Sequence, residues 1–313
     1  MIDFRYHLVS LISVFLALAL GIVVGTTQLN GAVLTDLHHQ VDGLKTDKHT
    51  LQQSTRQLQS QIKADDDFAT GVGASVVAGR LKGARVLVVA APQAGNALVD
   101  GVTQALKSGG ATISGQVQLT SDYVDPRLAT GLRDFVTSPG VLPAGLRLPR
   151  SNDSGVLAGS LLADVLMQPT SGNAPSNSER EQVLAGFSQL GVLRLVSKQV
   201  TPSDYAVLVA SDAQTGANPS AQAGTLSDLA GALDSQGKGA VVAGSAPVAG
   251  DDGVIGNIRQ DKAISAKVST VDDADRASGQ VITVLALADQ SKGKTGQYGI
   301  AGNAESTFPS NGQ

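Results

Sequence analysis

The chain has 313 residues, of which 16% are charged and 3% aromatic, and its formal net charge is −4. With no basic excess for phosphate contacts and few rings on which bases could stack, it is not expected to bind nucleic acid. It contains no cysteine, and all four histidines precede residue 50. Disulfides, thiolate nucleophiles, Cys/His zinc sites and Ser-His-Asp triads are therefore excluded beyond that point.

The first segment has the composition of a membrane anchor. Residues 8–24, LVSLISVFLALALGIVV, carry no charge, and Gly25, Thr26 and Thr27 extend the uncharged run. About 20 such residues in a helix cross a bilayer. Arg5 and His7 precede the run, and the next Lys or Arg is Lys45. The positive-inside rule then predicts a cytoplasmic leader over 1–7, a transmembrane helix over 8–27, and the bulk of the chain outside the cytoplasm.

Two further patterns lie in this segment. Residues 17–19 have the small-x-small form of a signal-peptide cleavage site, but cleavage there would leave the apolar stub 20–24 at the mature terminus. A retained anchor is the favoured reading. Ala17, Gly21 and Gly25 recur every four residues, a stripe that would let two membrane helices approach closely.

A heptad repeat follows and predicts a coiled-coil stalk over 30–66. Four leucines occupy the d positions: Leu37, Leu44, Leu51 and Leu58. The a positions are then Leu34, Val41, Lys48, Thr55 and Ile62. If residues 34–64 are helical, the stalk is about 45 Å long. The pattern favours a homodimer whose seam is formed by Leu37, Val41, Leu44, Leu51 and Leu58. The alternative is one amphipathic helix packed on the protein's own domain.

Three histidines fall on the stalk. In the heptad frame His38, His39 and His49 take e, f and b positions, so all three are expected to be exposed or on the rim of the seam. The favoured interpretation is that they are solvated side chains. The sharper hypothesis is an imidazole cluster for Cu(II), multiplied by oligomerisation. These are the metal candidates of the chain, and no other cofactor or catalytic residue is expected.

The remaining sequence alternates buried-type strands with helical patterns. Strands are expected over 85–90 (RVLVVA), 111–119, 192–196, 205–210 (YAVLVA), 240–243 and 267–271. Helices are expected over 94–107, 125–137, 154–168, 179–190, 226–235, 252–260 and 279–288, with a connecting helix or turn over 68–81. This order predicts an α/β domain over 80–290, a mostly parallel sheet with helices on both faces, and a C-terminal tail over 291–313.

Tests for catalytic and nucleotide-binding motifs are negative. The stretch SKGKT at 291–295 lacks the glycine that a phosphate-binding loop needs, because position 288 is Ala288. The aspartates at 272–275 could ligate Ca²⁺ or Mg²⁺ through their oxygens, but we favour capping of the following helix by Asp273 or Asp275. The aspartates at 251–252 are interpreted in the same way, as a capped turn beside Gly253. A two-carboxylate glycosidase ranks low because no aromatic platform for sugar is evident.

Several stretches resemble one known family. The opening MIDFRYHLVSLISVFLALALGIVVGT, the segment STVDDAD at 269–275, the later GQ with VITVLALAD at 279–289, and GQYG at 296–299 are similar to the mycobacterial copper transport protein B family of actinobacteria. The resemblance covers essentially the whole chain. It implies a non-enzymatic cell-envelope protein linked to copper export and copper resistance, described for that family as an outer-membrane pore. It brings no catalytic residues to this chain.

The residues fit part of that implication. An envelope location follows from the anchor, which favours the inner membrane, whereas short, continuously apolar strands with intervening helices do not suit a transmembrane barrel. Soft Cu(I) prefers Cys or Met, and the exported part offers Met167 alone. Two hypotheses follow. One is a membrane-tethered assembly that supports copper export, and the alternative is a coiled-coil scaffold that binds a septation or cell-wall hydrolase partner.

Overall fold

The computed structural model describes residues 4–170, 174–215 and 218–309. The chain divides into two compact units, residues 1–64 and residues 65–313. The first residues of the predicted leader, the last residues of the predicted tail and the side chain of Leu34, a predicted a position of the heptad, lie outside this description.

Helix α1 (Phe4–Val77) is continuous through the predicted membrane segment and stalk and into the second unit. Residues 68–77 are therefore the end of α1, and the expected separate connecting helix or turn over 68–81 is not present as an element of its own. No glycine or proline occurs between residues 44 and 70, so nothing in the sequence interrupts the helix there. The helix ends before Gly79, whose φ of 73° a glycine adopts without strain.

The second unit is built on one open sheet. Its strands are β1 (Arg85–Ala90), β2 (Thr112–Leu119), β3 (Leu193–Leu195), β4 (Tyr205–Ala210), β5 (Ala240–Gly244), β6 (Ser269–Val271) and β7 (Gln297–Tyr298). Their order is β3-β2-β1-β4-β5-β6-β7. All neighbours are parallel except β3, which runs antiparallel to β2. The predicted α/β class with a mostly parallel sheet is confirmed.

Helices connect the strands. They are α2 (Asn96–Ser108), α3 (Ala129–Val136), α4 (Ser154–Leu166), α5 (Asn177–Gln189), α6 (Pro219–Gln236), α7 (Val254–Gln260), α8 (Lys262–Ser265) and α9 (Ala277–Gln290). Short 3₁₀ turns, η1 (Ser121–Val124) and η2 (Ala246–Ala249), follow β2 and β5.

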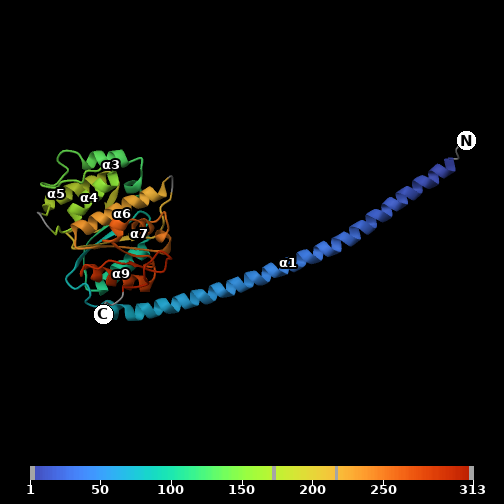
Figure 1. Ribbon diagram of the computed structural model, residues 1–313, viewed down its shortest axis with the longest axis horizontal. Helices are drawn as coiled ribbons and strands as arrows, with labels where there is room; N and C mark the ends of the chain where they lie inside the picture. The colour runs from blue at the N-terminus through green and yellow to red at the C-terminus, as the bar shows by residue number, and fades with distance from the viewer. Residues whose placement is uncertain (1–3, 171–173, 216–217, 310–313) are drawn as a thin grey trace. The chain divides into compact units, whose positions relative to one another are not determined.

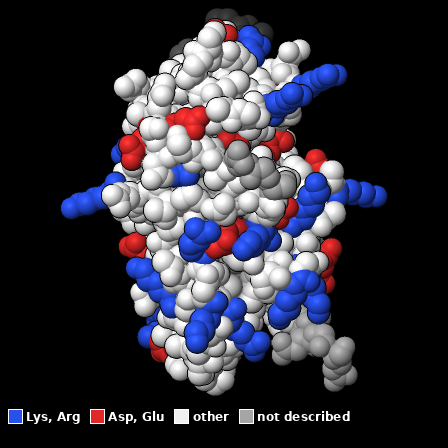
Figure 2. All heavy atoms as spheres, turned by 90° about the vertical axis from the view of Figure 1, so that its left-hand side faces the viewer, with Lys and Arg blue, Asp and Glu red and all other residues white. Residues whose placement is uncertain are grey.

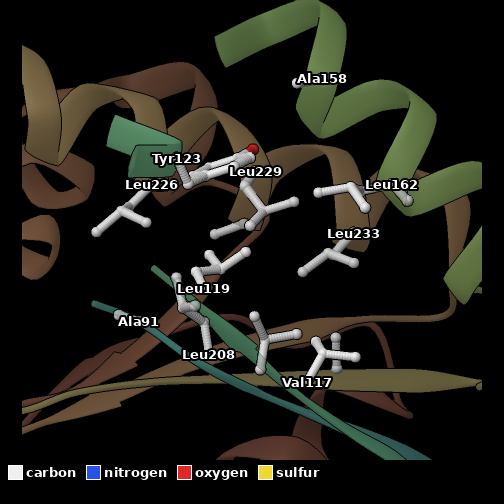
Figure 3. Close-up of a cluster of buried hydrophobic side chains, with 14 of the residues drawn as sticks. Ala91, Val117, Leu119, Tyr123, Ala158, Leu162, Leu208, Leu226, Leu229 and Leu233 are labelled. Carbon is white, nitrogen blue, oxygen red and sulfur yellow. The ribbon is translucent and has the colours of Figure 1, made fainter. Parts of the chain in front are cut away.

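Two apolar layers hold this unit together. One lies between the sheet and α3 to α7, and the other lies between the sheet and α2, α9 and the end of α1 (Figure 1). Figure 3 shows Leu119 and Leu208 of the sheet pointing toward Leu226, Leu229 and Leu233 of α6. Each of these leucines is 1% exposed or less. Burying one such side chain contributes about 1.5–3 kcal/mol.

The helix predicted over 125–137 begins later than expected. α3 starts at Ala129 because Asp125 forms a local turn instead. The Asp125 carboxylate accepts the Arg127 N–H at 2.8 Å and pairs with its guanidinium at 2.6 Å. Such an aspartate turn competes with the first turn of a helix.

The segment that follows α9 contributes an edge strand that sequence reasoning missed. β7 has only two residues and no apolar period, so its pattern carried no strand signal. It is held by the Gln297 side chain, whose amide donates to the carbonyls of Ser265 at 2.9 Å and Val268 at 3.1 Å and accepts from the Thr270 hydroxyl at 2.7 Å.

Candidate functional site

The first functional feature is the apolar part of α1. Phe4–Thr26 is long and apolar enough to cross a membrane, with a mean hydropathy of 2.7 and no part of it buried within the protein. Nothing lies within 4 Å of the positions that a Cβ would take at Gly21 and Gly25. With Ala17, these residues lie on an open stripe of the helix surface.

The predicted seam is the second feature, and it is uncovered. Leu37, Leu44, Leu51 and Leu58 are 54%, 68%, 68% and 58% exposed, and Val41 is 41% exposed. Within the first unit, no other described helix or strand packs against this stripe. Single exposed leucines are ordinary, but a regular row of them on a helix is typical of an interface.

The stalk histidines do not form a metal centre within one chain. His38, His39 and His49 are all exposed. His49 lies eleven residues beyond His38, about 16 Å further along the helix axis. Among the described residues there is no group of three or more His, Cys, Asp or Glu side chains placed to hold a metal ion. Met167 is 1% exposed, in the core, where it is not accessible to solvent.

A buried polar cluster lies at the carboxyl end of β6. Asp272 forms an ion pair with Arg259 of α7, 2.8 Å between Oδ2 and Nη1. Its other oxygen, Oδ1, accepts the backbone N–H groups of Ile300 at 2.7 Å and Ala301 at 3.1 Å. Arg259 in turn donates to the carbonyl of Tyr298 at 2.7 Å. The pair therefore fastens the segment after β7 to the sheet.

This arrangement corrects the interpretation of the acidic stretch. α9 begins after Arg276 with no side-chain cap, so neither Asp273 nor Asp275 caps it. Asp273 is 3% exposed, and its Oδ1 has no hydrogen-bond partner among the described residues. Burial, followed by the charge of Asp272, raises the pKa of Asp273 to about 6. Asp272 and Asp273 are therefore buried structural groups, whereas Asp275 is exposed.

The predicted capped turn at residues 251–252 is also corrected. α7 begins after Gly253 without a side-chain cap, and the Asp251 carboxylate instead accepts the Gln260 amide at 3.0 Å. Gly253 is tightly enclosed by the backbone of Val248, which leaves no room for a side chain. The turn therefore depends on the small size of Gly253 rather than on a carboxylate cap.

Doubly wound sheets commonly bind ligands where the strand order reverses, which here is between β1 and β4. A cavity of about 500 Å³ lies there, lined by residues that include Gln93, Asp122 and Gln214. Gln93 adopts a φ of 64°, and its carbonyl accepts the Ser211 hydroxyl at 2.8 Å. The residues that precede α2, PQAG at 92–95, do not form a glycine-rich phosphate-loop motif.

Sequence comparison with known proteins matches nearly the whole chain to one family. The family model described as "Copper transport outer membrane protein, MctB" matches residues 1–309. Proteins named Copper transporter MctB from Mycobacterium bovis and Mycobacterium tuberculosis are 30% identical over 310 residues, covering 98% of both chains. The Mycobacterium leprae protein of the same name is 30% identical over 315 residues, again covering 98% of both chains. Family membership therefore does not rest on an isolated segment: the chain belongs to the MctB family of copper transport proteins.

Proposed function

We propose that this chain supports copper export as a non-enzymatic, membrane-tethered dimer of the cell envelope. The relatives are named copper transporters, and the family is not an enzyme family. The observation that carries the proposal is the exposed heptad stripe of α1. Its leucines are regularly spaced and more than half exposed. A heptad spacing of this kind fits a second copy of the same helix as the partner.

The surface of α1 suits such a partner in detail. A hollow beside the stripe is lined by residues that include Leu44, Asp47, Lys48 and Leu51, which are spaced i, i+3, i+4 and i+7 along the helix. In a coiled coil, a side chain of the facing helix enters a hole formed by four residues. Lys48 and Thr55 weaken an apolar seam but restrict its register and the number of helices. These features support a dimer rather than unspecific association.

The proposed location is the inner membrane, with the second unit outside the cytoplasm. Arg5 lies ahead of the apolar segment and the next basic residue is Lys45, a distribution that keeps the amino terminus inside. The sheet of the described residues is open, with β3 and β7 at its edges. We therefore propose that the chain anchors an export assembly and does not form a barrel itself.

Copper is the cargo of this proposal and not a resident cofactor. The 16 Å between His38 and His49 prevents one ion from bridging them within a chain. Met167 is enclosed in the core. We therefore propose that the protein supports copper export by assembling in the membrane, and that its stalk histidines are not required.

Copper content of a deletion strain tests the proposal. Wild type and the His38→Ala/His39→Ala/His49→Ala variant are expected to lower the cellular copper content of this strain to the same level. Leu44→Asn/Leu51→Asn is expected to fail, because the asparagines place polar groups in the apolar seam. The control Thr46→Asn/Gln53→Asn introduces the same residue type outside the seam and is expected to restore export. Failure of the histidine variant would instead support direct copper binding, and rescue by the leucine variant would contradict the dimer.

A further inference from the structure

The amino-terminal edge of the sheet carries a row of lysines. Each lies two to five residues before a parallel strand: Lys82 before β1, Lys107 before β2, Lys238 before β5, Lys267 before β6 and Lys294 before β7. All five are exposed. Because parallel strands begin at the same edge, the topology gathers residues that are far apart in the sequence.

The strand order sets the length of this row. From β2 to β7 the sheet spans five strand spacings, about 24 Å at 4.8 Å each. Figure 2 faces this side of the domain and shows Lys and Arg side chains gathered over its lower part. The charges are therefore spread along a line and do not converge on one cavity.

The carboxylates at the same edge are already engaged within the protein. Asp204 pairs with Arg85 at 2.9 Å and with Lys238 at 3.0 Å, and its side chain is 11% exposed. Asp289 pairs with Lys292 at 3.2 Å and is 18% exposed. Asp234 accepts the N–H of Ala240 at 3.1 Å. The acidic groups are thus partly buried while the lysines extend into solvent.

Four lysines of the row are left to act on an outside partner. Within the described part of the chain, the ion pairs do not include Lys82, Lys107, Lys267 or Lys294. An ammonium group on a flexible stem is a compact point charge that binds phosphate without demanding a fixed geometry. A row of such groups fits a chain of phosphates better than a single small anion.

We propose that this lysine edge is a binding surface for a linear, phosphate-rich polyanion of the cell envelope. The polymer lies across the beginnings of the strands and contacts successive lysines. The few aromatic residues of the chain leave no stacking platform for bases, so the polyanion is recognised by its charge and spacing alone. The surface belongs to the second unit and does not require the proposed dimer.

Linear polyphosphate serves as the probe, with the full-length protein in an uncharged detergent. Wild type is expected to bind it with an affinity that falls steeply with salt, because counterions are released from the polymer. Lys82→Glu/Lys267→Glu/Lys294→Glu is expected to weaken binding at least tenfold. The matched control Arg56→Glu/Arg150→Glu/Arg194→Glu alters net charge equally with exposed residues outside the row and is expected to stay within about threefold of wild type.

Other outcomes would overturn the proposal. Equal losses in the two triple variants would show unspecific attraction to net charge. Tighter binding to vesicles of anionic phospholipid than to polyphosphate would assign the surface to a membrane. Equal affinity for orthophosphate, counted per phosphate, would remove the requirement for a polymer. Lys82→Gln/Lys267→Gln/Lys294→Gln, which removes charge without reversing it, is expected to give an intermediate loss, and an unchanged affinity would also contradict the proposal.

Discussion

Arg259 and Asp272 form an ion pair in the interior, with side chains 4% and 0% exposed and 2.8 Å between Nη1 and Oδ2. Removing one member of such a pair leaves a buried charge without its partner, which costs about 3–5 kcal/mol. Arg259→Met is therefore expected to lower the melting temperature and to release the segment after β7. Hydrogen exchange at the amides of Ile300 and Ala301, both bonded to Asp272, measures that release.

The double variant Arg259→Met/Asp272→Asn supplies the control for this pair. It removes both charges, so its loss of stability is expected to be smaller than that of Arg259→Met alone. If the double variant were destabilised by the sum of the two single losses, the ion pair would not be the interaction that holds the segment.

Gly299 lies directly over the Asp272 carboxylate. Its φ is 135°, and a Cβ at this position would overlap the carboxyl group of Asp272. Gly299→Ala is expected to destabilise the protein by more than 1 kcal/mol, on the order expected for backbone strain at such a site. Gly302→Ala is the matched control, because nothing lies within 4 Å of its added Cβ. Equal melting temperatures of the two variants would contradict this explanation.

Asp273 predicts a pH dependence of stability. Burial and then the charge of Asp272 raise its pKa to about 6. The folded protein holds this proton more tightly than the unfolded chain, so ionisation lowers stability as the pH rises from about 4 to about 6. Asp273→Asn is expected to raise the melting temperature at pH 7, by an amount corresponding to roughly 3 kcal/mol, and to change it much less at pH 4. The same increase at both pH values would rule out titration as the cause.

Membrane topology can be mapped on a clean background, because the chain has no cysteine of its own. A membrane-impermeant maleimide is expected to label Ser235→Cys, on the exposed surface of α6, in cells with a permeable outer layer. Asp3→Cys is expected to stay unlabelled until the inner membrane is opened, because the positive-inside rule keeps the leader in the cytoplasm. Labelling of both sites, or recovery of the protein in outer-membrane fractions, would contradict the proposed location.

The central strands could be predicted because local sequence and burial coincide in them. RVLVVA and YAVLVA are continuous apolar runs, and β1 and β4 form the middle of the sheet, where both faces are covered. The alternation of strands and helices along the sequence then indicates the α/β fold class. The heptad repeat of α1 can also be recognised in the sequence, but a repeat in one chain does not show which partner packs against it.

The cluster at β6 could not be predicted because its contacts are not local. Arg259 meets Asp272 only when α7 packs beside β6, and Ile300 meets it only when the segment after β7 returns to the sheet. No short spacing encodes these contacts. The sequence pattern of consecutive aspartates before a helix suggested capping, whereas the structure turns Asp272 and Asp273 inward.

The molar mass of the full-length protein in detergent, measured by light scattering, tests the proposed assembly most directly. A dimer formed through the stalk predicts two chains per particle for wild type and for Thr46→Asn/Gln53→Asn, and one chain for Leu44→Asn/Leu51→Asn. A wild-type protein that remains a single chain at all concentrations, or a leucine variant that remains dimeric, would contradict it.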